Sequence, residues 1–268
     1  MSLWRPEAVR IGLAPGRATL LRAAGRKHTV AAAQAVPLDL DTGEPGLQAL
    51  AAELAKPEYK GRHVDVVLSD ALVRYFVVRA PAGLRHRTEL LEAIAARFEE
   101  QFGLPAADWV LCPDLEPGGS AYLTCAMPRR LLEEIRRACA PVRLRSLRPF
   151  AISELNGFRR RLPRQGFWFA AVEGDSVTLA CRGKREWLWA RSQVVRQDFR
   201  DAVATIAARE ALREGLPEPV AIQCAGAVGH PVELAAPAPL ALLGNGLWAG
   251  TSPEWSGTYR LALSGLWQ

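Results

Sequence analysis

The sequence contains few residues of the types that carry out catalysis, and they are not grouped in a recognisable way. The four histidines are isolated from one another, without the short spacing that places two metal ligands on one face of an element. They are His28, His63, His86 and His230. Neither the GxSxG motif of a nucleophilic serine nor the Gly-rich phosphate loop that ends in Gly-Lys-Ser or Gly-Lys-Thr occurs. The adjacent pairs Glu99–Glu100 and Glu133–Glu134 would diverge by about 100° around a helix, which predicts solvated charges rather than a catalytic pair.

Five cysteines are scattered along the chain, and no two of them form a CxxC motif. They are Cys112, Cys125, Cys139, Cys181 and Cys224. The odd number and the wide spacing predict free thiols in a reducing compartment, without a structural zinc site. Cys112 and Cys125 both fall in predicted strands, which favours a place in the core over a role as nucleophile.

Arginine supplies the excess of positive charge, and the formal net charge is +6 at pH 7. A helix after Pro128 would carry one outward basic stripe, formed by Arg129, Arg130, Arg136 and Arg137. Such a stripe could bind anionic lipid headgroups or an acidic segment of a partner, or it could be an ordinary solvated face. No nucleic-acid motif occurs, and aromatic residues do not alternate with the basic ones, so we expect no nucleic-acid partner.

Length and composition are those of a folded globular protein. The 268 residues are 49% hydrophobic and 23% charged, which is enough for two modest domains. The first residues do not have the pattern of a signal peptide, and no run of about 18 apolar residues predicts a membrane span. We therefore expect a soluble protein.

The same order of predicted elements occurs twice. Apolar runs separated by turn residues predict strands at 9–13, 17–23 and 28–38, then a helix at 45–55 and a strand at 65–68. The second set has strands at 166–172, 176–181 and 186–192, then a helix at 198–214 and a strand at 219–224. We therefore predict an α/β protein with duplicated β-β-β-α-β domains of the RNase H-like kind, the plan of each half of an actin-like ATPase.

The segment between the two sets predicts an inserted α+β subdomain. It contains strands at 72–79, 108–112 and 120–126, and a helix at 87–102 that Gly103 ends. Pro128 is predicted to open another helix, with a strand at 142–147 and a helix at 149–158 after it. We predict a first lobe at residues 1–160, including an insertion at about 66–127, and a second lobe at residues 161–268.

The sequence resembles the actin-like proteins of type IV pilus and type II secretion assembly, the group of PilM and the GspL cytoplasmic domain. Three stretches carry the resemblance: the turn at 11–16, the passage at 66–76 that leads into the helix at 89–102, and the three strands at 167–192. The resemblance implies a cytoplasmic scaffold, held at the inner membrane by its partners, which binds the cytoplasmic tail of an inner-membrane platform protein. In the pilus branch this tail lies along the inserted subdomain. The partner-binding residues predicted here are Leu72, Arg74, Phe76, Arg129, Arg130 and Arg136.

The resemblance also implies a nucleotide site in degenerate form, at Gly12, Gly16, Gly174 and Gly226. The first turn of the group reads Gly-Leu-Asp-Ile-Gly, whereas this chain has Ala14 in place of the acid and Pro15 in place of a backbone donor. The first strand of the second hairpin is also expected to carry an acid, but it reads Ala-Ala-Val at 170–172. Magnesium requires carboxylates and phosphoryl transfer requires a positioned water. A scaffold without ATP, ADP or Mg²⁺ is therefore favoured over the alternative, a nucleotide-binding ATPase or sugar-kinase-like enzyme.

Overall fold

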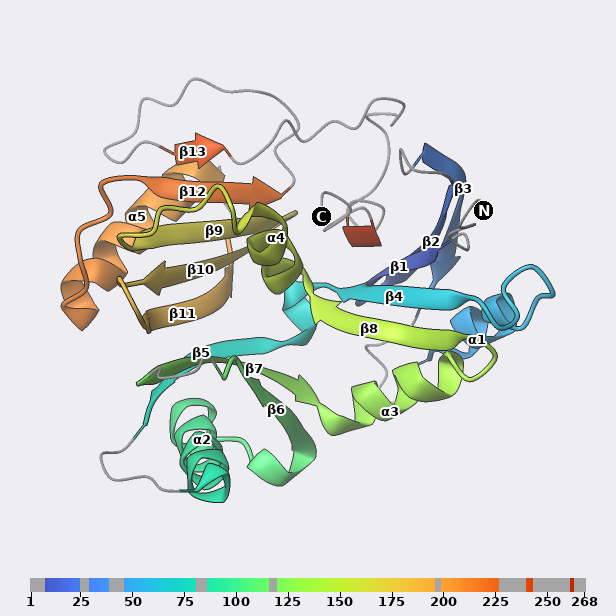
Figure 1. The fold of residues 1–268 in the computed structure, drawn as a ribbon, viewed down its shortest axis with the longest axis horizontal. Helices are drawn as coiled ribbons and strands as arrows, with labels where there is room; N and C mark the ends of the chain where they lie inside the picture. Colours follow the sequence, from blue (N-terminus) through green and yellow to red (C-terminus); the bar gives the residue numbers. More distant parts are fainter. Residues whose placement is uncertain are drawn as a thin grey trace, which may run out of the picture. The chain divides into compact units, whose positions relative to one another are not determined.

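The structure is a computed structural model, and it describes residues 8–24, 29–38, 46–80, 86–115, 120–195, 199–226, 240–242 and 261–262. These residues form three β-sheets with helices between their strands (Figure 1). The mixed α/β class predicted from the sequence is confirmed. By its contacts the chain divides into two compact units, one from the described parts of residues 1–72, 130–157 and 249–268, the other from those of 73–129 and 158–248. The lobe boundary predicted near residue 160 is derived from the order of the elements along the chain, whereas these units are defined by contacts. The boundary therefore stays a prediction.

The first unit contains a five-stranded sheet in the order β3-β2-β1-β4-β8. Its strands are β1 (Ala8–Ala14), β2 (Arg17–Ala24), β3 (Thr29–Pro37), β4 (His63–Leu68) and β8 (Arg143–Pro149). β1 is antiparallel to β2 and parallel to β4, which is parallel to β8. Its helices are α1 (Gln48–Leu54), α3 (Arg129–Ala138) and α4 (Phe150–Phe158). All residues of β4 after His63 are buried, as expected for a central strand covered on both faces.

The second unit repeats this sheet in the order β11-β10-β9-β12-β13. Its strands are β9 (Phe167–Glu173), β10 (Ser176–Arg182), β11 (Trp187–Val194), β12 (Ile222–Gly226) and β13 (Leu240–Leu242). β9 is antiparallel to β10 and parallel to β12. Helix α5 (Phe199–Glu214) joins β11 to β12, and its Val203 and Ile206 pack with Trp168 and Leu179 of the sheet. The duplicated plan predicted from the order of the elements is confirmed.

The inserted subdomain is a three-stranded sheet covered by one helix. Its strands are β5 (Arg74–Arg79), β6 (Trp109–Pro113) and β7 (Ala121–Pro128) in the order β5-β7-β6, and its helix is α2 (Arg87–Phe102). Short 3₁₀ turns, η1 (Asp70–Leu72) and η2 (Ala106–Asp108), precede β5 and β6. Aromatic rings fill the space between helix and sheet: the Phe98 ring lies 5.8 Å from that of Phe76 and 5.1 Å from those of Phe102 and Trp109.

The boundaries of helices α2 and α3 test the predictions made from local sequence signals. Helix α2 has the predicted bounds, and Gly103 ends it with a left-handed φ of 65° while its amide donates to the Glu99 carbonyl at 2.8 Å. The helix predicted to open at Pro128 is confirmed with a start one residue later, because Pro128 is the last residue of β7 and α3 begins at Arg129. The fixed φ of proline suits an extended strand end as well as a first helical turn, so the residue type alone does not decide between them.

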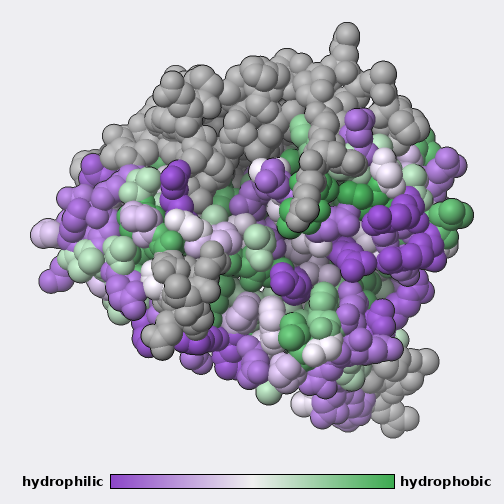
Figure 2. All heavy atoms as spheres, turned by 180° about the vertical axis from the view of Figure 1, so that it is seen from behind, coloured by the Kyte–Doolittle hydropathy of each residue, from purple (hydrophilic) through white to green (hydrophobic). Residues whose placement is uncertain are grey.

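Hydrophilic side chains cover most of the described surface in the view of Figure 2, with hydrophobic ones in small groups among them. The large hydrophobic residues that are exposed are Leu91, Leu104, Leu115, Val194, Leu212 and Val220. Within the described ranges, no helix is both long and apolar enough to cross a membrane.

The aromatic core predicts a large effect of one truncation. Phe98→Ala should lower the free energy of unfolding by about 3–5 kcal/mol, because a fully buried ring is removed from a packed cluster. Urea unfolding followed by tryptophan fluorescence measures the change. Glu92→Ala, on the exposed side of the same helix, is the matched control and should change it by less than about 0.5 kcal/mol. A similar small change for Phe98→Ala would contradict the core described for this subdomain.

Candidate functional site

The two glycines predicted in the first nucleotide hairpin have different positions. Gly12 lies within β1, buried and paired with Thr19 of β2 and Val67 of β4, whereas Gly16 lies in the two-residue turn between β1 and β2. Ala14 is the last residue of β1. Of the two turn residues only Gly16 has an amide hydrogen, because the other is Pro15. The turn therefore offers a phosphate one backbone donor and no carboxylate of its own.

In the second unit, Gly174 and Gly226 end neighbouring strands of one sheet. Gly174 lies in the β9–β10 turn with φ 55°, and Gly226 ends β12 with φ 104°, paired with Val172. The acids of this hairpin, Glu173 and Asp175, are at the turn rather than within β9. The structure thus brings Gly174 and Gly226 close together, while Gly12 and Gly16 belong to the other unit. A role of these glycines in nucleotide binding stays a prediction.

Metal-ligating side chains do not gather in the part of the chain that the structure describes. No group of three or more His, Cys, Asp or Glu side chains there could hold an ion. His63 begins β4 and His86 precedes α2, both exposed. His28 and His230 lie outside the described residues.

Asp70, directly after β4, is a buried acid with a structural task. Its side chain is 1% exposed, and both carboxylate oxygens lie 3.1 Å from the backbone nitrogen of Ala151, in the first turn of α4. A carboxylate at this place neutralises the positive end of the helix and satisfies a free amide. Ser69 accepts a hydrogen bond from the Ala71 amide at 3.2 Å, so Ser69 stabilises the turn after β4 while Asp70 caps the helix.

A second buried acid, Asp65, is the centre of a polar cluster on the first sheet. It accepts hydrogen bonds from Arg145 Nε at 2.9 Å and from Ser146 Oγ at 2.6 Å, and Arg145 Nη2 contacts its other oxygen. Arg145 reaches this position because the register of β8 against β4 passes from Leu144 directly to Ser146, which leaves Arg145 as the extra residue of a bulge. Arg10 of β1 stands opposite Asp65 on the other side.

The cluster shifts the ionisation of all three charged groups. Burial opposes the charge on Asp65, but hydrogen bonds from Arg145 and Ser146 and the charges of Arg145 and Arg10 bring the pKa of Asp65 below the usual aspartate value. The bond to Asp65 raises the pKa of Arg145. Burial lowers the pKa of Arg10 to about 10, against the attraction of Asp65. These charges hold β1, β4 and β8 together, which is a structural role.

The predicted partner-binding residues of the insertion differ in accessibility. Leu72 is half-buried in η1, and Arg74 is exposed on β5 with Nη1 3.0 Å from the Val73 carbonyl. Phe76 is fully buried in the aromatic core. The Phe76 ring cannot contact a partner, because the alternation of β5 turns it towards α2. Leu72 and Arg74 stay predictions.

The basic residues of α3 are exposed as expected, but they are not equivalent. The Arg129 guanidinium donates to the carbonyls of Ala107 at 2.9 Å and Trp109 at 3.1 Å, so it fastens the start of α3 to the beginning of β6. Arg137 pairs with Glu134. Arg130 and Arg136 are exposed, and their role in partner binding stays a prediction.

The open edge of the inserted sheet is a feature that the sequence did not reveal. Among the described residues β6 pairs with β7 alone. The Asp114 amide donates to the Leu123 carbonyl at 2.8 Å, and hydrogen-bonded pairs recur at every second residue of an antiparallel ladder. Cys112 therefore exchanges bonds with Cys125, whereas the amide and carbonyl of Leu111 face away from β7.

The cysteines occupy two different environments. Cys112 is exposed and Cys125 half-buried, so the prediction of a core position is wrong for Cys112. The reason is that β6 is an edge strand, which the sequence pattern does not distinguish from a central one. Cys139, Cys181 and Cys224 are buried, and burial raises the pKa of their thiols to about 11, 12 and 12.

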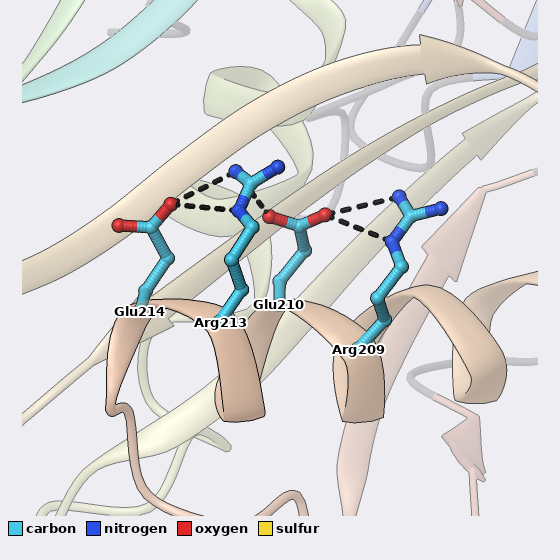
Figure 3. A network of polar contacts seen from close by, with 4 residues as sticks. All are labelled: Arg209, Glu210, Arg213 and Glu214. Atoms are coloured by element: carbon cyan, nitrogen blue, oxygen red, sulfur yellow. Dashed lines mark hydrogen bonds and ion pairs between the residues drawn. The ribbon is translucent and has the colours of Figure 1, made fainter.

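A hollow of about 520 Å³ lies along α5 and the residues after it, lined by Ala204, Ala208, Ala211, Leu212, Gly215, Leu216, Glu218 and Pro219. Most of these are small or apolar and would orient a substrate poorly. Glu210 of the same helix is 1% exposed, and its oxygens are held by Arg209 at 3.0 Å and Arg213 at 2.6 Å (Figure 3). Its carboxylate is used to order these arginines and is not a free acid.

The ion pair of Asp65 predicts a specific pH dependence. Because the folded pKa of Asp65 is lowered, its contribution is complete above the unfolded value of about 4 and is lost as the pH falls through the folded value. Asp65→Asn should lower the free energy of unfolding by only about 1 kcal/mol at neutral pH, because Arg145 is more than half exposed and solvent weakens the ion pair. The difference from the wild type should shrink below about pH 4. Urea unfolding at several pH values measures it.

Arg145→Met should flatten the same pH dependence, whereas Arg143→Met, an exposed arginine on the same strand, should leave it unchanged. A constant difference between the wild type and Asp65→Asn from pH 7 to about pH 3 would contradict the account of this cluster.

No protein-family model matches the sequence, and no curated protein matches it. Solved structures do. The cytoplasmic domain of EpsL, an inner-membrane component of the type II secretion system of Vibrio cholerae, superposes with a TM-score of 0.59 and 16% identity over 97% of this chain and 94% of that one. The PilM–PilN type IV pilus biogenesis complex superposes with a TM-score of 0.55 and 19% identity, over 83% of this chain and 82% of that one. A Bacteroides thetaiotaomicron protein of unknown function with an actin-like ATPase fold superposes with a TM-score of 0.50 and 10% identity, over 82% of this chain and 81% of that one.

At such identities the similarity concerns the fold. The two matching five-stranded sheets and the inserted subdomain agree with it, and the chain has the actin-like ATPase fold. The resemblance to the PilM and GspL group is confirmed at this level.

Proposed function

We propose that this protein is a non-catalytic cytoplasmic scaffold of an inner-membrane platform, in type IV pilus assembly or type II secretion. The main support is the match with the EpsL cytoplasmic domain, which extends over nearly the whole of both chains. The replacement of acids by Ala14 and by the apolar strand at 170–172 supports a role without catalysis. A scaffold needs the two-lobed framework of an actin-like protein but not its metal-bound nucleotide.

The partner in this proposal is the cytoplasmic tail of an inner-membrane protein, and the scaffold is held at the membrane through it. The complex of PilM with PilN is a precedent within the same fold. A tail of this kind adds to a folded protein most simply as an extended strand on an open sheet edge, where main-chain hydrogen bonds give the affinity.

The edge of β6 is the place we propose for this tail. The Leu111 amide and carbonyl point away from β7, and the half-buried side chains of Val110 and Leu111 supply apolar contacts on the two faces. The opposite edge strand, β5, lies against β11 and is less open. Arg74, Arg130 and Arg136 remain proposed contacts for charged parts of the tail.

Removal of one backbone donor tests the proposal. Leu111→Pro should weaken binding of the tail at least about tenfold, or about 1.4 kcal/mol, because the proline ring replaces the outward amide hydrogen without removing a bond to β7. The measurement is isothermal titration with a synthetic tail of the PilN-like inner-membrane protein of the same organism.

Leu111→Ala is the matched control, because it keeps the amide and removes more of the side chain. It should lose clearly less affinity than Leu111→Pro, because it gives up only the apolar contact of the Leu111 side chain and keeps the backbone donor. Equal losses of affinity in both variants would show that the tail binds elsewhere. If the wild type bound no tail, the proposed scaffold function would be wrong.

A nucleotide titration separates the scaffold from an enzyme. Millimolar ATP with magnesium should leave the melting temperature unchanged, because a ligand stabilises a protein only when it binds the folded state. Differential scanning fluorimetry measures it, with an active actin-like ATPase as the positive control. A rise that depends on magnesium would favour the nucleotide-binding ATPase or sugar-kinase-like alternative.

A further inference from the structure

Two cysteines that are distant in the sequence stand directly opposite each other in the inserted sheet. Cys112 of β6 pairs with Cys125 of β7. Directly opposite residues project from the same face of a sheet, here the face away from α2, since the neighbouring pair of Leu111 and Ala126 packs on the helix side. Cys112 is exposed and Cys125 half-buried. The sheet therefore carries two adjacent thiols, one of them open to solvent.

The hydrogen-bond pattern sets the separation of the two backbones. The bond from the Asp114 amide to the Leu123 carbonyl places Cys112 and Cys125 in a hydrogen-bonded pair, for which the Cα atoms lie about 5.5 Å apart. Disulfides span Cα distances of about 4.4–6.8 Å, so the backbone spacing fits. Opposite Cβ atoms lie about 4.5–5.5 Å apart, whereas a disulfide needs about 3.8 Å. Because hydrogen-bonded pairs lie at the wider end of this range, closure must draw the two Cβ atoms together by about 1.5 Å.

Strand β6 is suited to such a small movement. It has five residues, and among the described residues β7 is the only strand that pairs with it. The strain that remains after closure makes a disulfide easier to reduce, which is typical of reversible bonds rather than permanent ones. In a reducing compartment, the disulfides that do form are mostly transient and redox-sensing.

We propose that Cys112 and Cys125 form a reversible redox site that closes to a disulfide by exchange with a low-molecular-weight disulfide such as oxidised glutathione. The Cys112 thiolate attacks one sulfur of glutathione disulfide, forms a mixed disulfide and releases one glutathione thiolate. The Cys125 thiolate then attacks Cys112 Sγ and releases the second glutathione. The two protein thiols lose two electrons and two protons, and one glutathione disulfide becomes two glutathione thiols.

The other cysteines give the site its selectivity. Cys139, Cys181 and Cys224 are buried, and the raised pKa of each keeps the thiolate scarce near neutral pH. Partial burial also raises the pKa of Cys112, so its exchange should become faster as the pH rises towards that pKa. The inference does not depend on the proposed function, because it concerns the chemistry of the chain alone.

Equilibration of the whole chain in glutathione buffers, followed by peptide mapping with mass spectrometry, tests the site. We expect the wild type to lose the mass of two hydrogen atoms, with the peptides of Cys112 and Cys125 linked, and dithiothreitol should reverse this. Cys125→Ser should instead carry one glutathione on Cys112, because the second attack is impossible. Cys139→Ala is the control and should form the same bridge. Circular dichroism checks that each variant is folded.

Three results would overturn the proposal. The first is a lasting glutathione adduct on Cys112 of the wild type while Cys125 stays free. The second is a bridge that includes Cys139, Cys181 or Cys224. The third is a folded chain whose five thiols all remain reduced in oxidised glutathione.

Discussion

One parallel strand pair at the centre of each five-stranded sheet organises the protein. In the first unit, β1 pairs with β4 from Val9 against Val64 to Leu13 against Leu68, and β9 pairs with β12 in the same way in the second. These strands are buried on both faces, so their backbone groups have to bond within the sheet. The pairing continues past β4, because the Ser69 amide donates to the Leu13 carbonyl at 2.7 Å. That bond places Asp70, and through it the start of α4.

Local sequence patterns predict the helices and strands well, but they do not predict which distant residues these elements contact. The hairpins and α2 could be predicted, because turn residues and helical periodicity act over a few residues. The cluster around Asp65 could not, since Arg145 is 80 residues away and reaches it only through a bulge in β8. Phe76 shows a related limit. Strand β5 has apolar residues on both faces, but only the position of α2 decides that the Phe76 ring is buried rather than open to a partner.

In the candidate site, too, features set by neighbouring residues could be predicted, whereas features set by distant parts of the chain could not. Replacement of the expected acid by Ala14 can be read from the sequence, and the structure adds that Gly12 is a buried strand residue while Gly16 forms the turn. The exposure of Cys112 could not be predicted, because it follows from the strand order β5-β7-β6, which leaves β6 at an edge. Edge and central strands share one residue pattern when both faces are partly apolar.

Two edge strands of this protein differ in a way that bears on binding. On β8, Arg143, Arg145 and Arg148 are exposed and a bulge interrupts the ladder, both of which discourage pairing with another chain. Strand β6 has no charged residue and no bulge.

An open edge of the β6 kind favours self-association unless something limits it. Here the Trp109 carbonyl is occupied by Arg129, and Pro113 has no amide hydrogen to offer. Main-chain pairing is thereby confined to the surroundings of Leu111. A short edge of this kind limits the extension of the sheet between copies, and it agrees with the short extended tail proposed above.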